Sequence, residues 1–255
     1  MDLFQLTGKT AIITGGGRGL GAQIAVGYAK AGIEKLILCS RKKESCEATA
    51  QLLQKEYGVE VLSYACDVTD EENVKNVVKD IAEKVGEIDI LVNNSGASWG
   101  APFLEMPKQA WDKVIETNLT GTFLMSQAVG QVMSKQQGGV ILNIASIAGF
   151  GGTPPFMETV AYNSSKAGVI AFTKDLAVKL GEYNIRVNAL APGFFPTKMS
   201  NVLIEHGRDY IEGHTPLHRL GGEKDLMGAA IFFASDASSY ITGAILPVDG
   251  GMSAY

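Results

Sequence analysis

Tyr162 and Lys166 are four residues apart, a spacing that places two side chains on one face of a helix. A phenol beside an ammonium group can deliver a proton to an oxygen on which negative charge develops, as in ketone reduction. Because the reference pKa of tyrosine is about 10, ready proton exchange at neutral pH requires that pKa to fall. Lowering that pKa by about 2–3 units requires roughly 3–4 kcal/mol of preferential phenolate stabilisation, which the Lys166 ammonium, helped by a positively charged cofactor, could supply.

A glycine cluster near the start of the chain has the composition of a phosphate-binding turn. Residues Thr14–Gly21 lie between a short apolar run and a segment with helical spacing. Gly15 can form a tight turn, Gly19 lets the backbone approach a pyrophosphate, and Gly21 allows close helix–strand packing. No Gly-Lys-Ser/Thr follows, which excludes a P-loop. The expected dinucleotide contacts in this turn are Gly15, Arg18, Gly19 and Leu20.

The residue about 20 positions after the last glycine discriminates between nicotinamide cofactors. It is Arg41, between Ser40 and Lys42, where NAD enzymes place an acid for the ribose hydroxyls. Arg41 can bind a 2′-phosphate through charge-assisted hydrogen bonds, Ser40 can donate another, and Arg18 could close over the same phosphate. A solvated basic turn is the alternative. The sequence favours NADP(H) over NAD(H), and the missing acid counts against a methyltransferase.

Seven short β-branched runs alternate with longer segments of helical spacing. Most runs are continuously apolar, which is typical of strands covered on both faces in a parallel sheet. Strand–helix alternation implies βαβ crossovers, so we predict a single α/β domain over residues 1–255, with a doubly wound sheet of about seven strands and helices on both faces. The runs are Thr10–Thr14, Leu36–Ser40, Val59–Ala65, Ile88–Asn93, Val140–Ala145, Arg186–Leu190 and Ala244–Val248.

Two segments interrupt this alternation. Gly149–Pro155 is rich in glycine and proline and is predicted to be a loop. Residues 194–222 are mixed in character and are predicted to be a loop or lid on the substrate side, because ligands of such folds lie beyond the carboxyl ends of the strands.

Composition narrows the classes of function. The formal net charge is −5 and no basic block stands out, which counts against nucleic acid and anionic membranes. Cys39, Cys46 and Cys66 lack the spacing of a disulfide framework or a zinc site. The first residues do not resemble a signal peptide, and no apolar run approaches the ~20 residues of a spanning helix. We expect a cytoplasmic protein.

Four motifs, in order, resemble those of the short-chain dehydrogenase/reductase family over essentially the whole chain. The resemblance implies a single-domain Rossmann fold and an oxidoreductase that interconverts a ketone and a secondary alcohol. The motifs are Thr-Gly-x-x-x-Gly-x-Gly (Thr14–Gly21), a serine variant of Asn-Asn-Ala-Gly (Asn93–Gly96), Tyr-x-x-x-Lys (Tyr162–Lys166) and Pro-Gly-x-x-x-Thr (Pro192–Thr197).

The same resemblance implies a catalytic set of Asn118, Ser146, Tyr162 and Lys166. Ser146 would hydrogen-bond the carbonyl oxygen, Lys166 would also hold the nicotinamide ribose, and Asn118 would anchor a water that relays protons to Lys166. The remaining cofactor contacts implied are Asp67 and Val68 at the adenine, Asn94 and Gly96 beside the ribose, Tyr162 and Lys166 at the nicotinamide, and the Pro192-Gly193 turn with Thr197 at the carboxamide.

Two departures from the family pattern concern the substrate side. Ser95 replaces the usual alanine, and Tyr162 follows Ser146 by sixteen residues, against about a dozen in the family. The excess falls in Gly151–Val160, so we expect a lengthened loop over the substrate pocket. Candidate pocket residues are largely apolar, which suits an acyl chain better than a sugar acid: Trp99, Met157, Phe194, Phe195, Met199, Ile204 and Tyr210.

Three functions follow from these patterns. The first is a reductase of 3-oxoacyl groups carried on acyl carrier protein or coenzyme A, resembling the β-ketoacyl reductase branch. The second resembles the gluconate 5-dehydrogenase branch, through Leu38–Lys42. The third, of another class, is a non-catalytic dinucleotide-sensing protein, for which the catalytic set would be eroded. An acyl carrier protein would require a basic patch, for which Lys198, Arg208 and Arg219 are candidates.

His214 and His218 have the spacing of two metal ligands on a helix. Pro216 interrupts that helix and no glutamate accompanies them, so we predict no metal site. The C-terminal stretch Tyr240–Gly251 resembles the subunit-contact region of the family, which implies a homotetramer.

Overall fold

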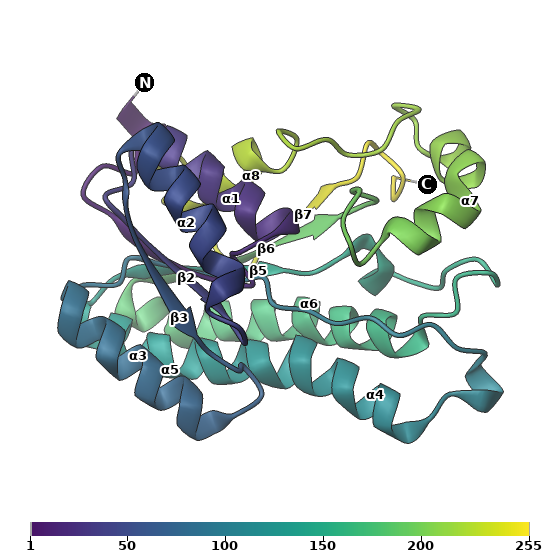
Figure 1. Ribbon diagram of the computed structural model, residues 1–255, viewed down its shortest axis with the longest axis horizontal. Helices are drawn as coiled ribbons and strands as arrows, with labels where there is room; N and C mark the ends of the chain where they lie inside the picture. Colours follow the sequence, from purple (N-terminus) through teal and green to yellow (C-terminus); the bar gives the residue numbers. More distant parts are fainter. Residues whose placement is uncertain (1, 255) are drawn as a thin grey trace.

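The computed structural model describes residues 2–254, whose seven strands form one parallel sheet in the order β3-β2-β1-β4-β5-β6-β7 (Figure 1). Each strand begins and ends within two residues of a predicted run, so the predicted doubly wound α/β fold is confirmed. The strands are β1 (Thr10–Thr14), β2 (Lys35–Ser40), β3 (Glu60–Ala65), β4 (Ile90–Asn93), β5 (Gly139–Ile144), β6 (Ile185–Pro192) and β7 (Ile245–Val248).

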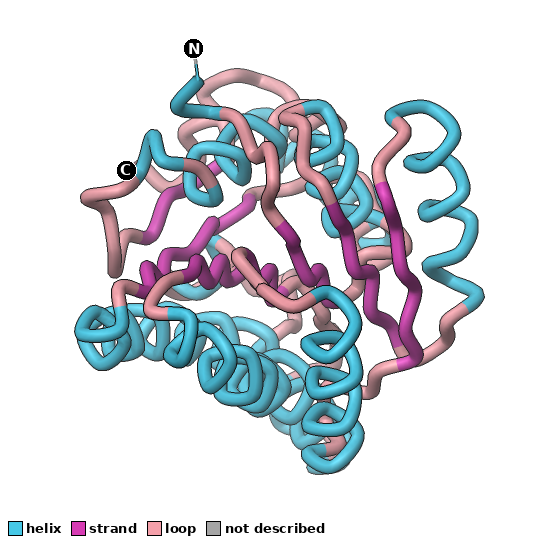
Figure 2. The backbone as a smooth tube through the Cα atoms, turned by 90° about the vertical axis from the view of Figure 1, so that its left-hand side faces the viewer, coloured by secondary structure: helices cyan, strands magenta, loops and turns pink. Residues whose placement is uncertain are grey.

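Helices cover both faces of the sheet (Figures 1 and 2). Ile12 and Ile13 are fully buried in two different apolar clusters, because successive side chains of a strand point to opposite faces. This double burial explains the continuously apolar runs. One layer contains α1 (Gly19–Lys30), α2 (Glu44–Tyr57) and α8 (Met227–Ala234), and the other contains α3 (Glu71–Val85), α4 (Lys108–Ile115), α5 (Gly121–Gln136) and α6 (Val160–Leu180).

Local signals set the helix ends. The Asp70 carboxylate accepts a hydrogen bond from the Asn73 amide at the start of α3, and Gly58, with φ of 68°, ends α2 in the left-handed region. Short helical turns occupy several connections: η1 (Asp2–Phe4), η2 (Phe103–Glu105), η4 (Ile147–Gly149), η5 (Gly181–Tyr183) and η6 (Asp236–Ser238), with a π-helical turn, η3, at Glu116–Thr120.

The substrate-side segment 194–222 is more ordered than a loop. It contains helix α7 (Asn201–His214), which lies outside both helical layers (Figure 1). Ile204 and Ile211 are buried, but Gly207 breaks the helical φ and ψ angles between them. The sequence pattern missed this helix because its only large apolar residues that are fully buried are these two, seven apart, with Leu203 partly buried beside them.

The carboxyl ends of the parallel strands meet at one edge of the sheet. The strand order reverses between β1 and β4, and such a reversal opens a crevice for ligands at that edge. Among residues 2–254, no helix is both long and apolar enough to cross a membrane.

Candidate active site

Ser146 and Tyr162 come together beyond the carboxyl end of β5. Ser146 follows this strand closely and is 8% exposed, while Tyr162 lies in the first turn of α6. The Ser146 hydroxyl lies close enough to the Tyr162 hydroxyl to lower the pKa of the phenol, and its oxygen accepts from the Ala148 amide at 3.2 Å. Two hydroxyls thus meet at a point where a carbonyl oxygen could be held from two sides.

Lys166 lies beneath this pair and is 4% exposed. Its Nζ donates to the Ile144 carbonyl at 2.6 Å and lies 5.6 Å from the centre of the Tyr162 ring. Burial lowers the pKa of Lys166 to about 8. Burial raises the pKa of Tyr162, while the hydrogen bond with Ser146 opposes that rise. Without a cofactor, burial therefore dominates the pKa of Tyr162, and the Lys166 ammonium donates to a backbone carbonyl. The lowering expected from Lys166 together with an oxidised nicotinamide stays a prediction.

Asn118 is fully buried within the π-helical turn η3, a type of turn that often marks a functional site. Its amide exchanges hydrogen bonds with the Ala97 backbone, at 2.7 and 2.9 Å, and donates to the Ser165 hydroxyl at 2.9 Å. The Ser165 hydroxyl donates in turn to the Tyr162 carbonyl at 2.7 Å. Asn118 is therefore linked to the first turn of α6, whereas its predicted role in anchoring a water stays a prediction. Ser165, missed in the sequence, lies three residues after Tyr162, which is a detectable helical spacing.

The backbone of the glycine turn has the conformation and the close contacts that only glycine permits. Gly15 and Gly19 have φ angles of 65° and 55°, in the left-handed region that favours glycine. A Cβ on Gly21 would lie only 2.5 Å from the Gly15 carbonyl oxygen, so a larger residue there would displace the loop. The Asn94 side chain holds the turn by donating to the carbonyls of Thr14, at 2.9 Å, and Gly15, at 3.2 Å. Its side-chain amide is thus already used within the protein.

The predicted phosphate-binding arginines lie on neighbouring connections. The Gly17 backbone packs against the Ser45 backbone, and the Thr49 hydroxyl donates to the Gly17 carbonyl at 2.9 Å. These contacts hold the glycine turn, with Arg18, against the start of α2, just after Arg41. Both arginines are exposed, and no acidic side chain that the structure describes pairs with either one.

Ser40, the third predicted phosphate contact, already has partners. Its hydroxyl donates to the Lys42 carbonyl at 2.6 Å and accepts from the Cys46 thiol at 3.3 Å. To donate a hydrogen bond to a phosphate, the Ser40 hydroxyl would first have to give up its hydrogen bond to the Lys42 carbonyl.

Asp67 and Val68 follow β3 beside this turn, because Cys66 donates through its amide to the Ser40 carbonyl at 2.8 Å. The Asp67 carboxylate accepts from the amide and hydroxyl of Thr69, at 3.0 and 2.8 Å. Val68 is 6% exposed. Both residues thus lie at the edge of the sheet where an adenine was expected.

The segment after β6 covers the glycine turn. The Thr197 methyl group is 3.6 Å from where a Cβ on Gly19 would lie, and the Met199 methyl is 3.8 Å from the corresponding point on Gly96. Gly193, after Pro192 at the end of β6, donates through its amide to the Val248 carbonyl at 3.0 Å. The segment after β6 therefore lies against the glycine turn and the segment after β4, at the carboxyl ends of the strands.

Ser200 holds the turn that carries Thr197 and was missed in the sequence. Its hydroxyl donates to the Phe195 carbonyl at 2.5 Å and accepts from the Thr197 amide at 3.0 Å. The Ser/Thr-rich turn before α7 is the sequence signal that could have indicated it.

The predicted substrate-side residues fall into three groups. Met157 and Ile204 are buried together with Phe194 packed against them, whereas Trp99, Met199 and Tyr210 are 36–49% exposed. Phe195 is 3% exposed and belongs to the main core beneath α1 and α8. Phe195 is therefore a core residue and the prediction that it lines the substrate pocket is wrong.

The predicted basic patch is partly neutralised. Arg208 pairs with Glu212 at 3.7 Å, and Arg219 makes two contacts with Asp225, at 2.5 and 3.0 Å. Lys198 is exposed. Two of the three cations therefore already have carboxylate partners.

The histidines are separated by the fold. His214 stacks on Tyr210 with ring centres 3.8 Å apart, whereas His218 lies beyond α7 with φ of 49°. Within the described part of the chain, no group of three or more histidine, cysteine or acidic side chains could hold a metal ion.

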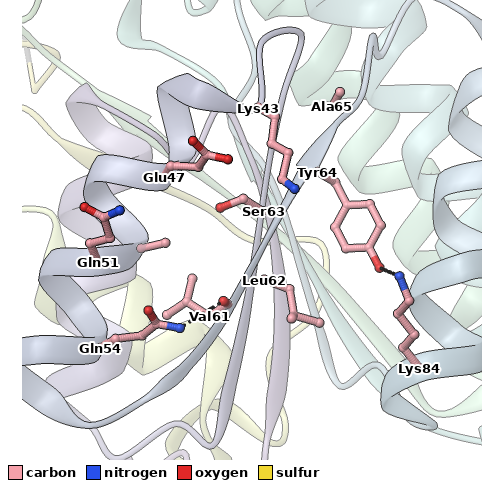
Figure 3. Close-up of a pocket in the computed structure, with 11 residues that line it drawn as sticks. Lys43, Glu47, Gln51, Gln54, Val61, Leu62, Ser63, Tyr64, Ala65 and Lys84 are labelled. Carbon is pink, nitrogen blue, oxygen red and sulfur yellow. Dashed lines mark hydrogen bonds between the residues drawn. The ribbon is translucent and has the colours of Figure 1, made fainter.

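A separate groove of about 540 Å³ lies along the outer edge of β3, between α2 and the α3 side chain Lys84 (Figure 3). Tyr64 and Lys84 are hydrogen-bonded across part of it, at 3.1 Å. None of the predicted catalytic or cofactor residues lines this groove. It is therefore distinct from the site around Tyr162.

Comparisons with known proteins show which family the chain resembles. A family model described as enoyl-(acyl carrier protein) reductase matches residues 15–253. A 3-oxoacyl-(acyl-carrier-protein) reductase of Aquifex aeolicus is 39% identical over 248 residues, covering 97% of this chain and 98% of that protein. A 5-keto-D-gluconate 5-reductase of Escherichia coli is 37% identical over 254 residues, covering 98% of each. A gluconate 5-dehydrogenase of Burkholderia cenocepacia, solved with NADP and tartrate, is 34% identical with a TM-score of 0.93, covering 100% of this chain and 98% of that one.

The chain therefore belongs to the short-chain dehydrogenase/reductase family. It is an oxidoreductase that interconverts a ketone and a secondary alcohol.

Proposed function

We propose that this protein is an NADP(H)-dependent reductase of 3-oxoacyl thioesters, with Tyr162 as the proton donor. The observation that carries the proposal is the arrangement of Ser146, Tyr162 and Lys166: the partly buried Tyr162 lies between the buried Ser146 hydroxyl and the buried Lys166 ammonium, whose Nζ is 5.6 Å from the centre of the Tyr162 ring. Such a set can hold a carbonyl oxygen and protonate it.

The residues around the glycine turn fit a dinucleotide, because the turn has left-handed glycines and two exposed arginines beside it. When bound, the nicotinamide supplies the hydride. Ser146 and Tyr162 would orient the carbonyl oxygen, and Tyr162 would give its proton to that oxygen as charge develops. Lys166 would stabilise the resulting phenolate and hold the ribose. Asn118 would keep the first turn of α6 in register and anchor the proton-relay water.

The preference for NADP(H) rests on Arg18 and Arg41, which are free of acidic partners among the described side chains. The further contacts proposed are those of the glycine turn, Asp67, Val68, Asn94, Gly96, the Pro192-Gly193 turn and Thr197. That a gluconate 5-dehydrogenase of similar structure was solved with NADP is consistent with this.

Arg41→Asp tests the cofactor. The substitution replaces a phosphate-binding cation by a repelling anion, so the ratio of NADPH to NADH affinity should fall by about 10²-fold, a free-energy change of about 3 kcal/mol. Lys55→Glu, an exposed change from cation to anion near the far end of α2, is the control and should leave the ratio unchanged. An unchanged ratio in Arg41→Asp would refute the assignment.

A 3-oxoacyl substrate is favoured by the apolar residues Met157, Phe194 and Ile204 and by the name of the 39% identical relative. The second candidate, a 5-ketogluconate reductase, is favoured by the name of the 37% identical relative. Consumption of NADPH, followed by absorbance, should distinguish them when the protein is mixed with 3-oxoacyl thioesters of coenzyme A and acyl carrier protein, diketones and 5-ketogluconate. Tight NADPH binding without turnover would instead favour the non-catalytic dinucleotide-sensing protein.

We also propose that the chain acts as one domain, in the cytoplasm, as a homotetramer. Support for assembly comes from exposed apolar side chains on α5 and α6, where Phe123 is 42% and Val178 is 75% exposed. Packing against a second copy of the chain would bury these apolar side chains of α5 and α6. Light scattering should give a mass of four chains, and Val178→Lys should reduce it.

A further inference from the structure

The connection between η4 and α6, residues 151–159, is anchored beside the catalytic tyrosine. Asn163, which directly follows Tyr162, donates through its amide to the Thr153 hydroxyl at 3.3 Å and accepts from the Thr159 hydroxyl at 3.0 Å. One side chain of α6 therefore holds both limbs of this connection. A shift of the connection would therefore move Asn163, the residue next to Tyr162.

The middle of the connection packs on α7. Met157 is 5% exposed and forms, with Ile204 and Ile211, a small apolar cluster separate from the two main cores. The Phe156 ring meets the Tyr210 ring edge to face, with centres 5.2 Å apart and planes at 80°. The connection and α7 thus share a core of their own.

Gly207 makes the approach of Phe156 possible. A Cβ at Gly207 would lie 2.9 Å from the Phe156 ring, closer than real contacts permit, while its φ of −125° is accessible to any residue. Gly207 is therefore required by the close approach of the ring rather than by its backbone angles. Phe156, Gly207 and Tyr210 form a unit that we call the aromatic clasp.

The same connection also reaches the opposite side of the site. The Glu158 carbonyl accepts from the Ala101 amide at 3.0 Å, two residues after Trp99. On the α7 side, the Met199 methyl carbon is 3.8 Å from the position that a Cβ on Gly96 would occupy. Residues 151–159 therefore bridge the segment after β4 and the segment after β6, which are the two sides of the space next to Tyr162.

We propose that Phe156 is a specificity-determining residue. By holding residues 151–159 on α7, the aromatic clasp fixes the outer wall of the substrate pocket and limits the length of the acyl group that fits with its carbonyl at Tyr162. The inference rests on the proposed function, because it concerns which ketones the enzyme accepts. It gives a role to the extra residues between Ser146 and Tyr162, which are sixteen positions apart in this chain and about a dozen in the family.

The size of the effect follows from pocket chemistry. Each methylene that a pocket admits or rejects changes kcat/KM by roughly tenfold or more. Removing the Phe156 ring should open the wall while leaving Ser146, Tyr162 and the glycine turn in place. The ratio of kcat/KM for a long acyl substrate to that for a short one should therefore rise by about tenfold or more.

The experiment compares Phe156→Ala with Phe150→Ala on acetoacetyl and 3-oxododecanoyl thioesters, with NADPH affinity measured by fluorescence. Phe150 is the matched control, because it lies immediately before this connection, at the end of η4, and is 45% exposed, against 46% for Phe156. Phe156→Ala should raise the long-to-short ratio at unchanged NADPH affinity, and Phe150→Ala should leave the ratio as it is. An unchanged ratio in Phe156→Ala, or an equal rise in both variants, would overturn the inference.

Gly207→Ala tests the clasp from the other side. Its added methyl group should displace the ring and change the ratio in the same direction as Phe156→Ala. In the Phe156→Ala background the same methyl group meets no ring, so it should have little further effect; independent, multiplying effects would contradict the clasp. If the unchanged protein reduced no ketone of the series, the proposed function itself would fail, a result distinct from an active enzyme whose ratio does not respond.

Discussion

The two sides of the active site are built differently. On the catalytic side, Ser146, Lys166, Asn118 and Ser165 are buried, and each hydrogen-bonds to β5, η4, α6 or the turn after β4. On the substrate side, the residues rest on a small cluster around Met157, closed by half-exposed aromatic rings. The first side is continuous with the sheet, whereas the second is attached to it through a few contacts.

This difference separates chemistry from selectivity. Groups that transfer a proton must be held within a fraction of an ångström, which a sheet and its covering helices provide. A wall that selects substrates need only exclude volume, so it can be built from a separate cluster that changes without disturbing the sheet. The comparison predicts that substitutions on the catalytic side affect all substrates equally, while those on the substrate side change their ranking.

Tyr162→Phe should have the largest effect. The change removes only the hydroxyl, and general acid catalysis contributes about 10²–10⁴-fold, so kcat should fall by about 10³-fold for every substrate. NADPH affinity should stay nearly unchanged. Steady-state kinetics on short and long thioesters would test this; a substantial residual rate, or a loss restricted to one substrate, would contradict the assignment of Tyr162.

Lys166→Met should stabilise the fold while abolishing activity. Burial lowers the pKa of Lys166 from 10.5 to about 8, which corresponds to a penalty of about 3 kcal/mol at neutral pH. Loss of the hydrogen bond to Ile144 offsets about 1 kcal/mol, so the variant should gain about 2 kcal/mol in free energy of unfolding at pH 7.

The same penalty has a defined pH dependence. Below pH of about 8 the folded protein holds the buried charge and the full penalty applies. Between about 8 and 10.5 the unfolded chain binds a proton that the folded chain lacks, so the wild type becomes more stable as pH rises. Urea unfolding at pH 7 and pH 10 should show the advantage of Lys166→Met shrinking, while the exposed control Lys174→Met shows no such trend.

Ser165→Ala should lower kcat by about tenfold with little change in KM. Ser165 is a positioning residue, because it connects the Asn118 amide to the Tyr162 carbonyl at 2.9 and 2.7 Å. The neighbouring Ser164, which is exposed, provides the control through Ser164→Ala. The pH profile of kcat should shift only in Ser165→Ala, since a purely structural loss would leave the profile in place, and Ser165→Thr should restore part of the rate.

Ile211→Ala should have the smallest effect on global stability. Ile12 lies in the central core, where such a truncation costs about 2–5 kcal/mol, whereas Ile211 belongs to the small cluster on α7. Because that cluster can open locally, we expect a cost of only about 1 kcal/mol, together with faster amide exchange in residues 151–159 and 201–214. Equal losses from Ile211→Ala and Ile12→Ala would show that the two sides are not separable.

Much of the fold was predictable from the sequence because its signals are local. Continuous apolar runs such as Ala11-Ile12-Ile13 determine buried strands, and glycines at fixed spacing determine the turn after β1. Helix α7 was not predicted, because its two buried isoleucines are stabilised by Met157, a residue more than forty positions away. The burial of Phe195 in the main core was missed for the same reason.

By itself the sequence determined the order of the strands along the chain, the chemical groups at the carboxyl edge and the spacing of Tyr162 and Lys166. Only the tertiary structure decided how those groups interact: that Lys166 donates to Ile144, that Ser165 connects Asn118 to α6, and that Phe156 lies on Gly207. The physical reason is that residue type and spacing follow from the chain, whereas burial, and with it pKa and contact, depends on which distant segments pack together.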